Sequence, residues 1–349
     1  AYIGDFRFIE QNYPLTRQLN GERQLDKALR EAVMALEPRN LEVRFELADL
    51  ERTETVVLAV AIERERVSRE AFAFPQGVRT KLIVEATLQI MLYDLQEGTL
   101  LESHPVSFAI NHVLKDEPDD IEPVALMLLE RLYLGEAGGE GGLIAMAADA
   151  IEELEPAGPG GLRFQVAELN FNDRIEPVTD EAGEAALLRQ RFGQRFSSLL
   201  AEQTGRQVVP FTRGYAIGHQ LPGRFTNGEA FSLSLPEPDY AFEIELQQLA
   251  KGQSEDQLVF HTQLNFAFVE PFTNDVLIQG DYRMGIFKLL SADRIRSDDW
   301  SAHEDSVESL FESLIWQLQS PDRAWHDAHA RNAGSFQQFN KKKDLFNDQ

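Results

Sequence analysis

The chain has 349 residues, a formal net charge of −25 at pH 7 and no cysteine. A charge this negative repels phosphate backbones and argues against nucleic acid as a partner, while the lack of cysteine excludes disulfides, thiolate catalysis and sulfur-ligated zinc. No apolar run approaches the roughly 18 residues that a membrane-spanning helix needs, so we expect no transmembrane segment.

Two stretches rich in glycine divide the chain. Residues 135–142 and 156–161 lack apolar periodicity and are typical of loops or linkers. At about 150 residues per domain, the length suits two domains. We therefore predict a first module over residues 1–155, a Gly/Pro linker over 156–161, a second module over 162–320 and a C-terminal arm over 321–349.

The first module contains alternating segments that are typical of strands and apolar stripes that are typical of helices. The alternation is longest at 80–93, where every second residue from Leu82 to Leu92 is apolar. A helical stripe of apolar residues recurs through 21–36. In chain order we expect strands at 3–9, 41–47, 55–62, 80–93 and 99–110, and helices at 21–36, 121–134 and 143–154.

The second module repeats this order of elements. We expect strands at 162–171, 207–211, 240–249, 258–269 and 276–287, and helices at 184–204 and 306–318. Each module is thus predicted to follow the order β-α-β-β-β-β-α. Strands with one apolar and one polar face suit a sheet that helices cover on one side. The predicted fold class is α+β, with two tandem modules whose mainly antiparallel sheets carry helices on one face.

A few residues of the second module resemble a module of bacterial envelope proteins. The likeness rests on 239–244 (DYAFEI), the alternating strands that follow and 276–280 (VLIQG), with a weaker version at 55–62, 81–93 and 100–103. The module is similar to the amino-terminal domain of the TolB translocation protein, the curli-secretion pore subunit CsgG, lipoprotein activators of penicillin-binding proteins and the middle domain of the flagellar ring protein FlgT. The resemblance implies a role in binding or assembly and carries no catalytic residue over to this chain.

The location follows from the resemblance and from the start of the chain at Ala1. A first residue other than methionine is compatible with removal of a signal peptide. We expect a periplasmic or outer-membrane-associated protein, with a cytoplasmic location as the alternative.

Two groups of aromatic residues are candidates for partner binding. The connection between 207 and 240 mixes aromatic residues with arginine, a combination that can anchor a partner. The polar tail carries further aromatic residues. The candidates are Phe211, Arg213, Tyr215, Arg224, Phe225, Phe231, Trp325, Phe336 and Phe339. The alternative for the connection is that it folds over the sheet and buries its aromatic side chains.

Two patterns point weakly to metal ions. Acidic residues at 116–120 and 293–305 precede the last helix of each module and have oxygen ligands for calcium, but aspartate also caps helices. His326 and His329 lie one helical turn apart without an evident third ligand. We expect capping and surface roles, and hence no metal and no cofactor. No catalytic motif is evident, so we name no catalytic residue.

These observations favour a non-enzymatic cell-envelope protein that assembles or scaffolds other envelope proteins. An open sheet edge can pair with another chain, so we expect a homo-oligomer, such as a ring or scaffold subunit of a flagellar or secretion-type complex. One alternative is a periplasmic binding module for a small molecule, glycan or peptide. The other is an enzyme of unrecognised type.

Overall fold

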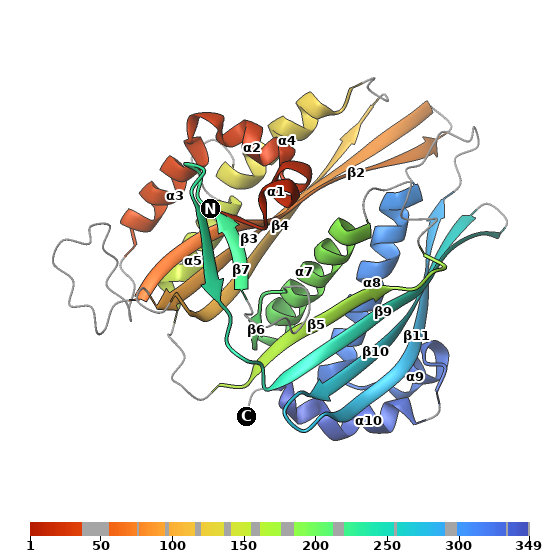
Figure 1. Cartoon of the computed structure of the whole chain (residues 1–349). Coiled ribbons are helices and arrows are strands. Elements are labelled where there is room, and N and C mark those ends of the chain that lie inside the picture. Colours follow the sequence, from red (N-terminus) through yellow and green to blue (C-terminus); the bar gives the residue numbers. More distant parts are fainter. Residues whose placement is uncertain are drawn as a thin grey trace. The chain divides into compact units, whose positions relative to one another are not determined.

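The computed structural model shows an α+β protein, which confirms the predicted fold class (Figure 1). The structure describes residues 1–36, 56–74, 77–94, 98–115, 120–135, 141–154, 161–175, 185–211, 220–254, 257–289, 299–332 and 334–347. The chain forms two compact units. Unit 1 comprises residues 1–70, 78–161 and 218–236, and unit 2 comprises residues 71–77, 162–217 and 237–349.

Unit 1 contains a six-stranded sheet in the order β4-β3-β2-β1-β7-β8. β1 is parallel to β2 and antiparallel to β7, and β3 is antiparallel to β4. The strands are β1 (Tyr2–Ile3), β2 (Val56–Phe74), β3 (Gly77–Asp94), β4 (Leu100–Leu114), β7 (Gln220–Arg224) and β8 (Ala230–Ser234).

The helices of unit 1 come before β2 and after β4. The first group is α1 (Phe6–Asn12), α2 (Pro14–Leu19), η1 (Asn20–Glu22) and α3 (Gln24–Met34), and the second is α4 (Glu122–Leu134) and α5 (Leu143–Glu152). The predicted strand at 3–9 is wrong beyond Ile3. The Asp5 carboxylate accepts a hydrogen bond from the Phe8 amide at 2.8 Å, and this N-cap starts α1 within the alternating segment.

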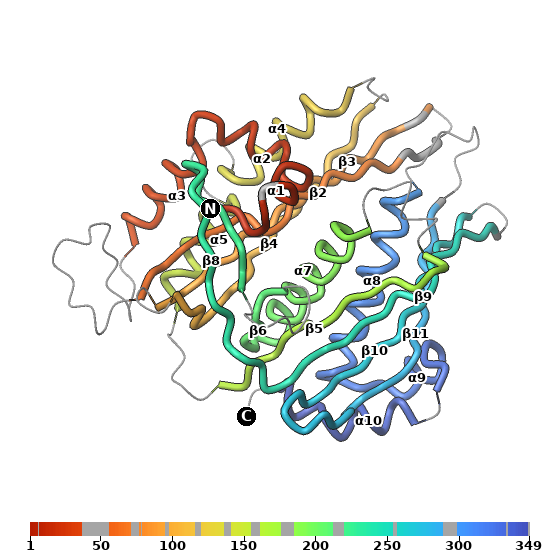
Figure 2. Tube along the Cα trace, in the orientation of Figure 1, coloured from red at the N-terminus to blue at the C-terminus, as the bar shows by residue number. Residues whose placement is uncertain are grey.

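Unit 2 contains a five-stranded sheet in the order β11-β10-β9-β5-β6, and its trace runs from green to blue in Figure 2. β9, β10 and β11 are antiparallel, whereas β5 is parallel to both β9 and β6. The strands are β5 (Arg163–Phe171), β6 (Gln207–Val209), β9 (Tyr240–Ser254), β10 (Gln257–Glu270) and β11 (Asp275–Leu289). The helices are α7 (Ala185–Thr204), α8 (Asp299–Gln319), α9 (Arg323–His329), α10 (Ser335–Lys342) and η2 (Lys343–Leu345).

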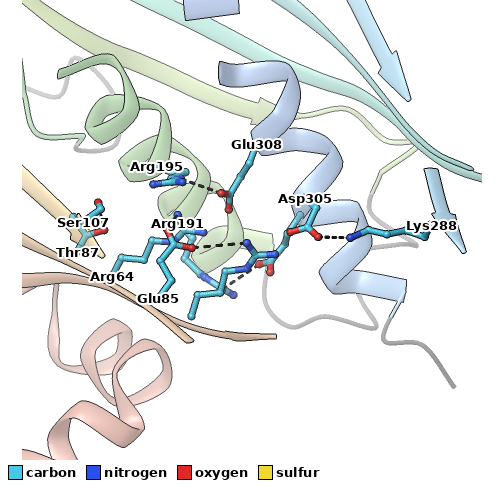
Figure 3. Close-up of polar contacts among 11 residues, drawn as sticks. Arg64, Glu85, Thr87, Ser107, Arg191, Arg195, Lys288, Asp305 and Glu308 are labelled. Carbon is cyan, nitrogen blue, oxygen red and sulfur yellow. Dashed lines mark hydrogen bonds and ion pairs between the residues drawn. The ribbon is translucent and has the colours of Figure 1, made fainter. Parts of the chain in front are cut away.

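Helices cover one face of the unit 2 sheet. α7, α8 and α10 contribute to a continuous apolar core with this face, in which Phe242, Phe266 and Phe311 are fully buried. Ion pairs also connect α8 to α7 and to β11. Arg195 on α7 lies 3.0 Å from Glu308 on α8, and Lys288 on β11 lies 2.7 Å from Asp305 on α8 (Figure 3). The opposite face of the sheet, called the second face below, carries the other set of side chains.

The connection before β9 differs from its prediction. No strand was predicted between the strands at 207–211 and 240–249, but this stretch contains the hairpin of β7 and β8, which pairs with β1 in the sheet of unit 1. The predicted strand at 41–47 and most of the predicted linker at 156–161 lie outside the described residues. Among the described helices, none is both long and apolar enough to cross a membrane.

Candidate anion-binding site

A β-bulge in β9 changes which side chains reach the second face of the unit 2 sheet. Phe242, Ile244 and Leu246 alternate toward the core, but the next core residue is Leu249. The pairing of β9 with β10 shifts at this point, because Leu246 pairs with Leu264 and Gln248 pairs with Gln263. A bulge leaves one residue extra and re-aims its side chain.

The bulge opens a depression of about 620 Å³ on this face. β9, β10 and β11 supply its floor, the segment after β5 supplies one side, and the turn after α9 supplies Arg331. The lining residues are Asn172, Arg174, Gln247, Gln248, Ala250, His261, Thr262, Gln263, Arg283 and Arg331. A volume of this size is within the range of small-molecule sites, about 300–1,000 Å³.

A chain of hydrogen bonds fixes the amide groups in the depression. The Arg331 guanidinium donates to Gln263 Oε1 at 3.2 Å, and Gln263 Nε2 donates to Gln247 Oε1 at 2.7 Å. Gln247 Nε2 then donates to Asp281 Oδ1 at 3.3 Å, which also accepts from Asn265 at 2.8 Å. Reversing either glutamine amide would bring two donors or two acceptors together, so this chain fixes the orientation of the polar floor.

The depression is positive although the chain is strongly negative. Three of its lining residues are arginines, and none of those ten residues is acidic. Arg174 and Arg283 are exposed, and their side chains form no ion pair or hydrogen bond with any described residue. Guanidinium groups bind carboxylate, phosphate and sulfate through two parallel hydrogen bonds. The arrangement can therefore hold an anion.

Acidic residues lie both beside the depression and further along this sheet. Asp281, two residues from Arg283 on β11, accepts a hydrogen bond from the lining residue Gln247. Glu168 on β5 pairs in register with Glu243 on β9, which places two carboxylates beside each other. Burial raises the pKa of Glu243, and the charge of Glu168 raises it further. The lining arginines form no ion pair with a described carboxylate, which leaves their positive charge available to an anion.

The partner-binding residues predicted in the connection fall into different places. Phe211 is buried in the core of unit 2, where its ring covers Gly193. Arg213 and Tyr215 lie outside the described residues. The rings of Phe225 and Phe231 contact each other on the hairpin of β7 and β8 in unit 1, with centroids 4.8 Å apart and planes tilted by 41°.

The remaining candidate of the connection, Arg224, binds its own turn, because its guanidinium donates to the Gly228 carbonyl at 2.9 Å. Of the described candidates in the connection, Phe211 therefore belongs to unit 2, whereas Arg224, Phe225 and Phe231 belong to unit 1.

The aromatic residues predicted in the tail mostly serve the fold. Phe339 is fully buried in the core of unit 2, so it is not available to a partner. Trp325 stacks on His329 at 4.7 Å and on Tyr282 at 6.1 Å. Phe336 is partly exposed, with the Arg323 guanidinium over its ring at 5.0 Å.

His326 and His329 do not face each other as metal ligands would. His326 Nδ1 lies 2.8 Å from Ser335 Oγ, which lies 2.7 Å from the hydroxyl of Tyr282. Burial lowers the pKa of His326 to about 4. His329 Nδ1 instead lies 2.9 Å from the Trp325 carbonyl. The contact between Ser335 and His326 is buried, and both residues line a small pocket of about 310 Å³.

The acidic segments show the capping and pairing expected of helix ends. Asp120 accepts a hydrogen bond from the Glu122 amide at 2.9 Å, at the start of α4. Asp299, in the first turn of α8, pairs with Lys251 at 2.7 Å. Residues 116–119 and 291–298 lie outside the described residues. Within the described ranges, no three His, Asp or Glu side chains gather as a metal site would require.

The residues of the depression were missed at the sequence level. They come from five segments between Asn172 and Arg331, and no one segment is unusual in composition. One local signal was present, since the pair Gln247-Gln248 interrupts the apolar alternation of β9.

Comparison with known proteins leaves the family open. No protein-family model and no curated protein matches the chain. A solved Xanthomonas campestris protein of family DUF330 is 12% identical, covers 47% of this chain over 87% of its own length, and has a TM-score of 0.26. A neuraminyllactose-binding hemagglutinin homologue from Helicobacter pylori is 12% identical, covers 50% of this chain over 96% of its own, and has a TM-score of 0.25. Likenesses this low support no conclusion about function, so the resemblance to envelope assembly modules stays a prediction.

Proposed function

We propose that the chain is a non-enzymatic binding protein that holds a small anionic ligand in the depression of unit 2. The observation that carries the proposal is the gathering of Arg174, Arg283 and Arg331 in a depression without an acidic lining residue, on a chain of net charge −25. An uncompensated cluster of this kind lowers the free energy of a bound anion through charge-assisted hydrogen bonds.

The chemistry of the depression selects among ligands. Its walls are arginine, glutamine, asparagine and histidine, with no aromatic side chain among the described lining residues. A large apolar ligand would bury these polar groups without partners, which costs free energy. A carboxylate, phosphate or sulfate group instead accepts hydrogen bonds from the guanidinium and amide groups. We therefore expect a small, polar ligand with one or more such groups.

Isothermal titration calorimetry tests the proposal. Citrate, inorganic phosphate and sulfate are titrated at low ionic strength, with glucose as the neutral control. We expect at least one anion to bind, glucose not to bind, and Arg283→Gln to weaken anion binding by about tenfold, because a lost charge-assisted hydrogen bond is worth about 1.5–3 kcal/mol.

The matched control is Lys27→Gln, which removes one exposed positive charge from α3 in unit 1. It should leave the affinity unchanged. Equal weakening by both variants would show a general charge effect, and no binding of any anion would overturn the proposal.

A second candidate function is self-association, and β4 favours it. This strand lies at an edge of the unit 1 sheet and runs for 15 residues, far beyond the usual five or six. Val113 on β4 is 60% exposed. Long exposed edges pair readily with another strand, and two copies of one edge can pair about a two-fold axis. We propose that a second copy of the chain pairs with β4, as an envelope scaffold subunit would.

Light scattering after size exclusion measures this association. We expect a dimer or larger oligomer for the wild type and a shift toward monomer for Val113→Lys, since a charge on an edge strand opposes pairing. The control is Met127→Lys, a similar change at an exposed position on the helix α4 instead of an edge strand. A wild-type monomer would exclude the candidate. Fractionation of cells tests the proposed envelope location separately.

A further inference from the structure

We infer that ligand binding in the depression locks the C-terminal arm onto unit 2, because the arm itself completes the site. The arm is defined here as residues 321–332 and 334–347, which include α9, α10 and η2. This inference rests on the proposed function and concerns its regulation.

The turn after α9 extends the sheet at the edge of β11. Ala330 forms an antiparallel bridge with Tyr282, and the Arg331 amide donates to the Asp281 carbonyl at 2.9 Å. The Asn332 side chain donates to the Gln279 carbonyl at 3.0 Å. The backbone of the arm therefore occupies the hydrogen-bonding edge of the strand that also carries Arg283.

From this edge, the Arg331 side chain reaches the second face of the sheet. Its guanidinium donates to Gln263 on β10 and lines the depression, while the residue as a whole stays exposed. One of its five N–H donors is used in this bond. The remaining donors are available to an anion that also contacts Arg283 on β11. Such an anion would bridge the arm and the sheet.

The arm is anchored on the opposite, core face by a separate set of contacts. Ser335 Oγ lies 2.7 Å from the Tyr282 hydroxyl and 2.8 Å from His326 Nδ1, and Phe339 is buried beside them. In the sequence, Arg331 lies between the anchoring residues His326 and Ser335, and its side chain lines the depression. Undocking of the arm would withdraw one of the three arginines from the ligand.

Thermodynamic linkage then requires a reciprocal effect. A ligand that binds the docked arm better than the undocked arm shifts the population toward the docked state. By the same factor, a change that loosens the arm weakens the ligand, even when it lies outside the depression. The structure offers Ser335 as such a position.

Hydrogen–deuterium exchange on the full chain, with and without saturating citrate, tests the inference. We expect citrate to slow exchange in residues 323–346 of the wild type. Arg283→Gln should bind about tenfold more weakly yet keep this protection once saturated, whereas Arg331→Gln should bind more weakly and lose it. Ser335→Ala should speed exchange in the arm and weaken citrate binding without altering any lining residue.

The outcomes separate the inference from the proposed function. If calorimetry shows that citrate does not bind the wild type, the proposed function fails for this anion, and inorganic phosphate replaces it as the probe. If the anion binds but arm exchange is unchanged, or if Ser335→Ala leaves the affinity intact while loosening the arm, the coupling is wrong and the binding function stands. Arg331→Lys, which keeps the positive charge, separates loss of charge from loss of folding.

Discussion

The sheets of the two units share one arrangement and differ at one edge. In unit 1, the first strand, β1, lies parallel to β2, with β3 and β4 beyond it. In unit 2, the first strand, β5, lies parallel to β9, with β10 and β11 beyond it. On its other side, β5 is followed by the parallel strand β6, which has three residues, whereas β1 is followed by the antiparallel hairpin of β7 and β8.

The difference teaches that the edge beside the first strand can be filled by a parallel strand, as in unit 2, or by an antiparallel hairpin, as in unit 1. The hairpin reaches β1 from far along the sequence, since Tyr2 pairs with Arg224. Its contacts extend beyond the backbone, because Leu221 and Leu233 are buried and Thr226 donates to Asp26 at 2.7 Å. The sheet of unit 1 is therefore completed by a hairpin that follows residues 162–217 of unit 2 in the sequence.

The sheets also differ in how charges are compensated. In unit 1, Glu85 on β3 lies 3.2 Å from Arg64 and 3.8 Å from Arg66, and all three side chains are largely buried (Figure 3). In unit 2, Arg174 and Arg283 face the depression without an acidic partner among the described residues. Loss of one partner of a buried ion pair leaves an uncompensated buried charge and destabilises the fold, whereas exposed uncompensated charges are suited to a ligand.

The largest expected effect concerns the hairpin. Leu221 is 1% exposed, and Leu221→Ala should lower the free energy of unfolding of unit 1 by about 4 kcal/mol, because large-to-small changes in a core leave a cavity. Val208→Ala in β6, the strand at the corresponding edge of unit 2, removes less apolar surface and should cost about half as much. Urea unfolding followed by hydrogen exchange assigns each loss to its unit. A loss below 1 kcal/mol for Leu221→Ala would show that the hairpin contributes little to the stability of unit 1.

The next effect contrasts the compensated and uncompensated charges. Glu85→Gln should lower the free energy of unfolding by about 3 kcal/mol, because two buried arginines lose the carboxylate that they contact. Arg283→Gln should change it by less than about 0.5 kcal/mol, as is usual for an exposed side chain without such partners. Chemical denaturation of both variants measures this difference. Similar losses would mean that Arg283 has a structural role.

The predicted elements that succeeded are the ones with a long, regular pattern. The strand predicted at 80–93 is β3, and the helix predicted at 121–134 is α4, each within a few residues of its true ends. In both segments the apolar residues that form the pattern are buried, as are Leu82 and Leu92 in β3 and Leu128 in α4. The strand predicted at 3–9 failed because a single capping bond from Asp5 outweighs a short alternation.

The hairpin of unit 1 and the site of unit 2 could not be predicted, because strand register and long-range pairing assemble them. β7 contains Pro222 and Gly223, residues that weaken a strand signal, and it forms because β1 offers a free edge. Likewise, Gln248 and Gln263 meet only through the bulge, and Arg331 joins them only through the edge of β11. The local composition of the sequence does not indicate any of these contacts. The aromatic residues that were predicted to bind a partner mostly pack within the fold.

A third effect is pH dependence, which should differ between the units. Burial lowers the pKa of His326 in unit 2 to about 4, against an ordinary value of 6.5. The unfolded chain then binds more protons than the folded chain between these values, so stability is full above pH 6.5 and is lost as the pH falls. From the shift of the pKa, the loss at pH 5 is about 2 kcal/mol.

Unit 1 provides the contrast for this effect. Burial raises the pKa of its Tyr133, which keeps its proton throughout this range, and lowers the pKa of its Ala1 amino group from 8.0 to about 6, so the loss in unit 1 begins at a higher pH than the loss in unit 2. The measurement is the free energy of unfolding between pH 7 and pH 4.5 for the wild type and for His326→Gln, with hydrogen exchange reporting each unit. The variant should have the flatter profile in unit 2, and parallel profiles would show that His326 does not sense acid. Asp322, Asp327 and His329 face the same group and remain in both proteins.

The smallest effect concerns the paired carboxylates on the unit 2 sheet. Like charges directly opposite each other on neighbouring strands are destabilising by a few tenths to about 1 kcal/mol, and Glu243 pairs with Glu168 in register. Because burial and Glu168 raise the pKa of Glu243, the folded chain binds protons more tightly than the unfolded chain at this residue, and ionisation of Glu243 lowers stability as the pH rises above its ordinary value of 4.5. Glu243→Gln should therefore raise the free energy of unfolding by about 0.5 kcal/mol at pH 7 and leave it unchanged below pH 4. An equal gain at both values would trace the stabilisation to the shape of the side chain instead of its charge.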